Sequence, residues 1–241
     1  MSRRVEEFRG LAQASRVRLL AEVQRTPGLL LRELAERTGL HENTVRDHLI
    51  VLEDGGLIAR RTVHTGTRGR PPATYHPVTA PGTNREAERR IERAAQHGDL
   101  LRRIEPAMGR EDLDPDTLHQ LDTLYEHLDD AGLQPDLDDV NLQIELVPCP
   151  YYDLIDRDPS LVCRVHSQLI RDVLAQVPGR VGLTLLEPFR THDRCRVHLE
   201  VSTLSVSEES GLPSGARVAQ HPGDHERTCA DEHEQPQPEG V

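Results

Sequence analysis

Apolar side chains recur at helical spacing in three short runs near the start of the chain, over residues 15–25, 29–38 and 41–54, and Pro or Gly closes each run. Because residues three and four positions apart share one face of a helix, each run predicts a short amphipathic helix. The segments LIARRTVH and ATYHPV follow and flank the loop TGTRGRPP. Two short strands around a Gly- and Pro-rich loop are typical of a β-hairpin.

The rest of the chain predicts two helices and then a small mixed domain. Residues 84–104 are rich in Arg and Glu, as in a connecting helix, and residues 114–131 repeat Leu at amphipathic spacing. Farther on, LQIEL alternates as a strand does, residues 159–177 have a helical pattern, and VGLTLLEP and CRVHLEV alternate again. This order of strand, helix, strand and strand predicts a small α+β domain.

We therefore expect an α+β protein of four parts. The parts are a helical domain with a hairpin at residues 1–80, a helical linker at 81–134 that pairs two subunits, a cysteine-containing sensor domain at 135–205 and a tail at 206–241. Ser, Glu, Gly, Pro and His dominate the tail, so we expect it to be disordered.

The charge of −12 is distributed unevenly. All 29 basic residues are Arg; residues 1–80 carry 13 of them against 9 acidic residues, whereas residues 81–241 carry 16 against 32. A polyanionic partner is therefore expected to contact the first third of the chain. No apolar run approaches the roughly 18 residues of a membrane span, and the charged N-terminus lacks a signal-peptide pattern, so we expect a cytoplasmic protein with no membrane partner.

The stretch LRELAERTGLHENTVRDHLIVLEDGGL has the pattern of two crossing helices. Gly39 permits the tight turn between them, and Val45, Leu49 and Leu52 would bury one side of the second helix. This spacing, with the hairpin after it, resembles the winged helix-turn-helix of the ArsR-like bacterial regulators. The resemblance covers about residues 12–78 and implies binding to double-stranded DNA.

The resemblance gives the exposed polar residues of this segment expected roles. The start of the recognition helix is expected to reach base edges in the major groove. The strand and the hairpin tip are expected to contact phosphates or a narrow minor groove. The predicted DNA-contacting residues are Glu42, Asn43, Thr44 and Arg46 on the helix, Arg60 and Arg61 on the strand, and Arg68 and Arg70 at the tip.

Three of the four cysteines fall in the second domain, and Cys229 lies in the tail. No two form a CxxC pair, which disfavours a compact structural zinc site. Cys149 follows the first strand, Cys163 lies early in the helix, and Cys195 shares the inward parity of the last strand. Three thiolates at one rim with an apolar surround suit an iron–sulfur cluster.

The segments CPYYDLIDRDPSLVCRVHSQLI and LLEPFRTHDRCRVHL resemble the sensor domain of the SufR-like repressors, winged-helix regulators of iron–sulfur cluster assembly operons. With the first domain, the resemblance covers about 190 residues. It implies that Cys149, Cys163 and Cys195 hold the cluster and that the cluster-bound form represses. A 4Fe–4S cluster is favoured over a 2Fe–2S cluster. The fourth ligand stays open among His166, His192, Cys229, Asp193 and an exogenous ligand.

Together these features predict a homodimeric repressor of iron–sulfur cluster assembly (suf-type) genes that binds a palindromic operator and senses iron or oxidation. A thiol-redox regulator, or one that responds to zinc or another metal, is the alternative within the same class. A cluster carrier or scaffold that uses the winged helix to dock proteins is the alternative from a different class. The motifs of common hydrolases, zinc proteases and P-loop enzymes are lacking, so we expect no enzyme.

Overall fold

The computed structural model describes residues 14–63, 71–104, 113–138, 141–147, 158–191 and 194–202. All of them belong to one compact unit, Met1–Thr203. The predicted tail at 206–241 lies outside the described residues. No helix in the described ranges is long and apolar enough to cross a membrane.

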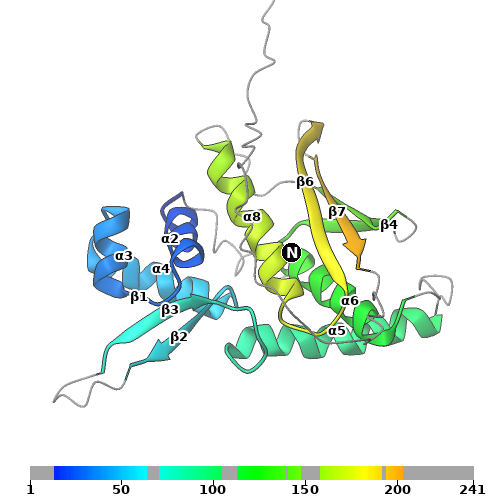
Figure 1. Ribbon diagram of the computed structural model, residues 1–241, viewed down its shortest axis with the longest axis horizontal. Coiled ribbons are helices and arrows are strands. Elements are labelled where there is room, and N and C mark those ends of the chain that lie inside the picture. Colours follow the sequence, from blue (N-terminus) through cyan, green and yellow to red (C-terminus); the bar gives the residue numbers. More distant parts are fainter. Residues whose placement is uncertain are drawn as a thin grey trace, which may run out of the picture. The chain divides into compact units, whose positions relative to one another are not determined.

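The first part of the chain folds into helices and a small sheet (Figure 1). In chain order its elements are α2 (Ala14–Arg25), β1 (Leu29–Leu30), α3 (Leu31–Thr38), α4 (Glu42–Asp54), β2 (Ile58–Thr62) and β3 (Ala73–Pro77). The three predicted helices and the hairpin are thus confirmed. Gly39 ends α3 with a φ of 67°, a left-handed conformation that glycine adopts without steric cost.

One short strand of this part was not predicted. Leu29 and Leu30 pair antiparallel with Tyr75 and Thr74 of β3, so the small sheet has the order β1-β3-β2. The helical spacing of the leucines had placed Leu30 inside the second helix, whereas α3 starts one residue later. Two residues are too few to show strand alternation, and their pairing with a segment 45 residues away is a tertiary effect.

The second part contains a four-stranded antiparallel sheet with helices. Its elements are α5 (Arg85–Ile104), α6 (Pro115–Asp130), β4 (Gln134–Asp138), β5 (Gln143–Val147), α8 (Pro159–Leu174), β6 (Val181–Thr191) and β7 (Arg194–Val201). The strand order is β4-β5-β7-β6. Helices α6 and α8 pack against the sheet, and α5 packs against α6. Strand β4 was not predicted, and Leu137 is the only large apolar residue among its five.

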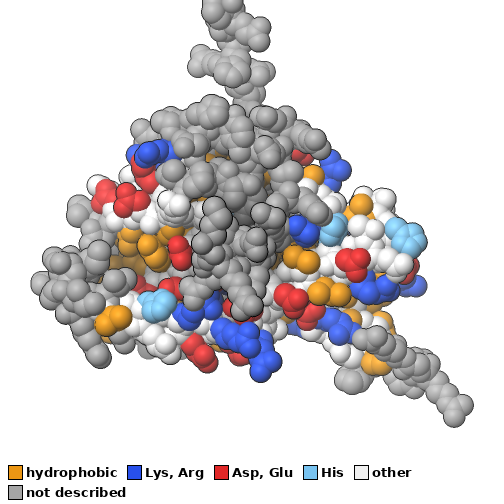
Figure 2. Space-filling view, turned by 180° about the vertical axis from the view of Figure 1, so that it is seen from behind, with side chains coloured by type: hydrophobic (Ala, Val, Ile, Leu, Met, Phe, Trp, Pro, Cys, Tyr) orange, Lys and Arg blue, Asp and Glu red, His pale blue; other side chains and the backbone are white. Residues whose placement is uncertain are grey.

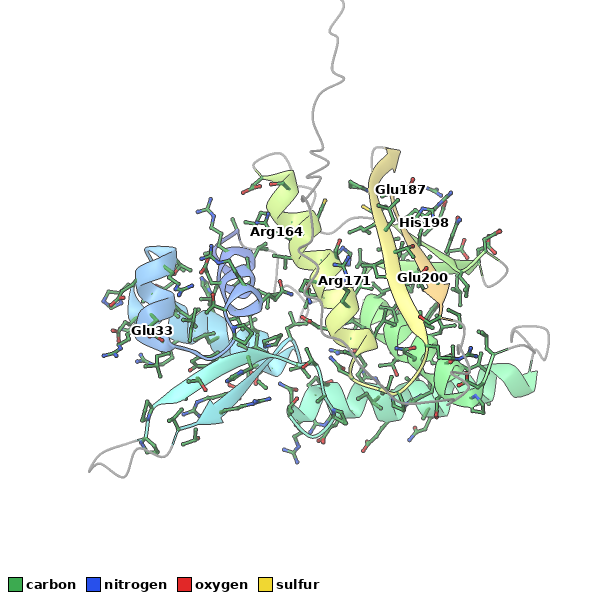
Figure 3. The ribbon with its side chains drawn as sticks, in the orientation of Figure 1. Glu33, Arg164, Arg171, Glu187, His198 and Glu200 are labelled. Atoms are coloured by element: carbon green, nitrogen blue, oxygen red, sulfur yellow. The ribbon has the colours of Figure 1, made fainter. Side chains whose placement is uncertain are left out.

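The alternation along β7 separates an apolar face of the sheet from a polar one. Cys195, Val197 and Leu199 are buried, as their parity predicted, and Arg196 and His198 lie on the other face. His198 contacts Glu187 of β6, with 2.9 Å between Nε2 and Oε2 (Figure 3). Arg196 forms an ion pair with Glu145 of β5. On the side of the molecule turned away from the viewer of Figure 1, charged side chains of both signs lie beside apolar ones (Figure 2).

The apolar face of α6 has a different partner from the one predicted. Leu121, Leu124 and Leu128 pack in one core with Ile144 and Val197 of the sheet, instead of standing free to pair two subunits. The sequence shows that a helix has an apolar stripe, but it does not show which surface covers that stripe. Within α6, the side chains left for another molecule are those outside this core, such as Tyr125, which is 38% exposed.

Helix α8 contributes to two cores at once. Val162, Val165 and Leu169 pack with α2, α3 and α4 in the core of the first part. Ile170 and Val173, on the other side of the helix, pack with α6 and the four-stranded sheet. A movement of α8 relative to the sheet would therefore also disturb the packing of α2.

Candidate DNA interface and cysteine site

Helix α4 presents one polar face and buries the other. Asn43, Arg46 and Asp47 are exposed, and Ile50 is 49% exposed on the same side. The Arg46 guanidinium donates a hydrogen bond of 2.7 Å to Oδ1 of Asn43. These two side chains therefore form a connected donor and acceptor group near the start of the helix, where base-reading residues of a recognition helix lie.

The buried side of α4 fixes this orientation. Val45, Leu49 and Leu52 are at most 1% exposed, as their spacing predicted. Nε2 of His48 lies 2.9 Å from the Ser15 hydroxyl of α2. Burial, with the charge of Arg16 as a second cause, lowers the pKa of His48 and keeps the ring neutral near pH 7.

The end of α4 is held by two residues that the sequence analysis missed. Asn84 donates from Nδ2 to the carbonyls of Glu53, at 2.7 Å, and Ile58, at 2.9 Å. The buried Arg90 of α5 donates from Nη2 to the Gly55 carbonyl at 3.0 Å. Ala87 and Ala94, one turn to either side of Arg90, are also buried, and this small-residue spacing was the only sequence signal of an inward face.

The hairpin of β2 and β3 carries the other predicted DNA contacts. Arg60 and Arg61 of β2 are exposed, as a phosphate-contacting role requires. Both also belong to an antiparallel strand that pairs with β3, so the sheet fixes where they project. Arg68 and Arg70 lie outside the described residues, and so the structure does not test their predicted roles.

Two of the predicted cluster ligands are described, and the topology brings their segments to one end of the sheet. Cys163 lies early in α8, and Cys195 is the second residue of β7. Helix α8 packs against β6, which pairs antiparallel with β7, and the start of α8 and the start of β7 lie at the same end of the sheet (Figure 1). Cys195 is 6% exposed, and Cys163 is partly buried.

Cys149 lies outside the described residues, and only its position in the sequence relative to β5 is known. Leu146 of β5 is the cross-strand neighbour of Cys195, and Cys149 follows Leu146 by three residues. No group of three or more His, Cys, Asp or Glu side chains in the described ranges could hold a metal ion. The described part therefore supplies two thiols, and the remaining cysteines, Cys149 and Cys229, lie outside it.

Among the predicted fourth ligands, only His166 is described. It lies on α8, is 7% exposed, and burial lowers its pKa to about 4. Burial likewise lowers the pKa of His127 of α6, and the two rings interact electrostatically. Both rings are therefore neutral at pH 7, the form in which a histidine nitrogen binds a metal. His192, Asp193 and Cys229 lie outside the described residues.

The comparisons with known proteins concern the first part of the chain. Residues 14–59 match the model of a family described as winged helix-turn-helix DNA-binding. No curated protein and no solved structure matches the chain. With the helix geometry above, this match shows that residues 14–59 form a winged helix-turn-helix DNA-binding domain. The chain is accordingly a DNA-binding transcription regulator.

Proposed function

We propose that this transcription regulator is a homodimer that represses iron–sulfur cluster assembly genes in response to an iron–sulfur cluster, in the manner of the SufR-like repressors. Cys149, Cys163 and Cys195 would hold the cluster, and His166, His192, Asp193, Cys229 or an exogenous group would complete the set. The proposal assigns the chain no enzymatic activity. It places the protein in the cytoplasm, where thiols stay reduced.

The observation that carries the proposal is the double packing of α8. Cys163 sits on this helix beside Val162 of the DNA-binding core, two turns before Ile170 of the sheet core. A ligand bond at Cys163 therefore acts on the same rigid element that packs against α2. This contact gives a physical route from a sensor to the recognition helix, which a carrier of clusters would not need.

The donor set fits the proposed group. Thiolates are the usual ligands of iron–sulfur clusters, and apolar surroundings tune their potentials. Cys195 lies among Leu146, Val197 and other apolar side chains of the sheet core. A bound cluster would supply iron–thiolate bonds that tie β7, α8 and the segment after β5 together, and a charge that changes on oxidation.

The chain's own residues would then determine the response. Helix α8 is anchored to α2 by Gln24, which donates from Nε2 to the Val165 carbonyl and to Oδ2 of Asp172, each at 3.4 Å. These long hydrogen bonds are weaker than those of 2.8–3.0 Å, so this junction can adjust at low cost. A shift of α8 would change the distance between the two recognition helices of a dimer, which must match the half-site spacing of a palindromic operator.

The first experiment is an ultraviolet–visible spectrum of the full chain purified without oxygen, together with iron and sulfide analysis. We expect a broad absorption band at about 400 nm, which arises from thiolate-to-iron charge transfer. Cys163→Ser and Cys195→Ser should each abolish the band. Ser167→Ala, one turn farther along α8, is the matched control and should retain it.

A colourless protein that stays free of iron after reconstitution would rule out the cluster. Bound zinc, or thiols that oxidise reversibly to disulfides, would then support the alternative metal or thiol-redox regulator. Operator binding with and without cluster, measured at two salt concentrations, tests the repressor mechanism. Cluster binding without sequence-selective, salt-dependent DNA binding would support a carrier or scaffold instead.

A further inference from the structure

An open groove of about 750 Å³ lies between α2, α3 and α8. No residue of α4, β2 or β3 lines it, and neither do Cys163 and Cys195, so it is separate from the DNA interface and from the cysteine site. Its volume falls within the range of small-molecule sites in proteins. The groove thus forms a third candidate site, where the DNA-binding domain meets α8.

The groove is strongly basic. Arg18 and Arg25 of α2, Arg37 of α3 and Arg164 of α8 line it, and among the described residues Glu22 is the single acidic one in its lining. This concentration is unusual in a chain with a net charge of −12. Four guanidinium groups in one concavity attract anions, because a concave low-dielectric surface focuses their field.

Glu22 carries one negative charge against these four positive ones, so most of the positive charge is not neutralised. Oε2 of Glu22 accepts from Arg25 at 2.6 Å and from Arg37 at 3.5 Å. Arg18 and Arg164 form no ion pair with any residue in the described part of the chain, and both are exposed. They come from opposite walls of the groove, α2 and α8, so one anion with two charged groups can contact both walls.

The floor of the groove offers apolar and amide surface. Ala21 and Val165 line it together with Gln24 and Gln168. The amide nitrogens of both glutamines donate to the Asp172 carboxylate, at 3.4 and 2.8 Å, which restricts their rotamers. Amide and apolar surface between the cationic side chains suits an organic ligand with a short carbon skeleton better than a bare inorganic ion.

We infer that this groove binds a small organic anion with at least two carboxylate or phosphate groups, which bridges Arg18 of α2 and Arg164 of α8. The bound anion removes the repulsion between the two guanidinium groups and holds α8 against the DNA-binding domain. It therefore acts as an effector that is coupled to operator binding. The site itself requires no cluster.

The test is isothermal titration of the full chain with citrate, succinate, pyrophosphate and glucose 6-phosphate, at constant ionic strength set with chloride. We expect saturable binding of at least one probe with one site per chain. Arg164→Ala and Arg18→Ala should each weaken it about tenfold or more, the usual effect of losing a charge-assisted hydrogen bond. Comparison of the carboxylate and phosphate probes identifies the preferred group.

Arg171→Ala is the matched control. Arg171 is also exposed on α8, two turns beyond Arg164, and does not line the groove (Figure 3). It should leave the affinity unchanged within about twofold. No saturation by any probe at about 10 mM, or an equal loss in Arg171→Ala, would overturn the inference, since equal loss means attraction by net charge alone.

A second measurement tests the effector role and separates it from the cluster. Operator affinity is measured at matched ionic strength with and without a saturating concentration of the best probe, using the Cys163→Ser variant. We expect the affinity to change in this variant and to stop responding when Arg164→Ala is added, because coupling between two sites is reciprocal. An operator affinity that ignores the anion would refute the effector role, whatever the spectrum of the wild-type protein shows.

Discussion

Replacing Arg90 by Met is expected to destabilise the fold by about 2–3 kcal/mol. The Arg90 side chain is 1% exposed, and it contacts two elements besides its own helix. Nη2 donates to the Gly55 carbonyl at the end of α4, and Nε lies 3.5 Å from Oδ2 of Asp130 at the end of α6. Met retains much of the apolar stem while removing the charge and the donors.

The magnitude follows from what each partner loses. The Gly55 carbonyl, which is partly buried, loses the only side-chain donor that contacts it in the described part of the chain, at a cost of about 1–3 kcal/mol. Asp130 keeps its contact with Arg93, so its charge stays paired. Burial lowers the pKa of Arg90, and Nη1 has no hydrogen-bond partner among the described residues, so removing the guanidinium also recovers some desolvation energy. The net loss is therefore smaller than for a buried pair left with one charge.

The measurement is urea unfolding followed by circular dichroism at pH 7, with Arg89→Met as the control. Arg89 is the preceding residue, its side chain is 55% exposed, and within the described part of the chain it pairs only with Glu86 on its own helix. An exposed pair of this kind contributes at most about 0.5 kcal/mol. If both variants lost the same amount, or if Arg90→Met lost less than about 1 kcal/mol, the assigned anchoring role of Arg90 would be wrong.

Three further predictions concern other parts of the chain. Burial raises the pKa of Asp172 to about 6; the folded state therefore binds its proton more tightly than the unfolded chain does, and stability falls as pH rises from about 4 through about 6. The free energy of unfolding of Asp172→Asn relative to that of wild type, measured with urea, should therefore rise by about 2–3 kcal/mol between pH 4 and pH 7.5. Parallel pH profiles of the two proteins would contradict this. Gly39→Ala should lower the free energy of unfolding by about 1 kcal/mol, because its φ of 67° strains any residue with a Cβ. The added Cβ meets nothing within 4 Å, so the cost comes from the backbone alone, and an unchanged urea midpoint would disprove the strain. Arg46→Ala should weaken operator binding about tenfold without changing stability, as checked by gel shift against Arg89→Ala, and equal affinities would exclude Arg46 from the interface.

Local patterns predicted most of the elements because each element satisfies its own periodicity. The parity of β7 placed Cys195 inward, and the spacing of Val45, Leu49 and Leu52 placed the exposed face of α4 correctly. The DNA-binding domain was predictable for the same reason, since its helices and its hairpin are each encoded within about 20 residues. A helix-turn-helix is a local arrangement, and local arrangements leave regular sequence patterns.

The missed features all depend on contacts between distant segments. Arg89 and Arg90 are chemically identical neighbours, yet one is exposed and the other buried, because only Arg90 faces the ends of α4 and α6. The apolar stripe of α6 predicted burial but not its partner, which is the sheet and not a second subunit. The groove at Arg164 was missed for the same reason, since its walls are more than 120 residues apart in the sequence.

These distant contacts also explain how the DNA-binding domain can respond to events elsewhere in the molecule. Arg90 and Asn84 hold the end of α4, whereas Val162, Val165 and Leu169 of α8 complete the core beneath α2. The first connection combines hydrogen bonds of 2.7 and 3.0 Å with a buried guanidinium, so it fixes the recognition helix relative to α5. The second combines apolar packing with the long hydrogen bonds of Gln24 and borders a groove with two cations that lack ion-pair partners among the described residues. Binding of a ligand can therefore shift α8 more easily than it can shift the end of α4. A variant such as Gln24→Ala should alter the response to cysteine ligation or to an anion while leaving the anchored end of α4 in place.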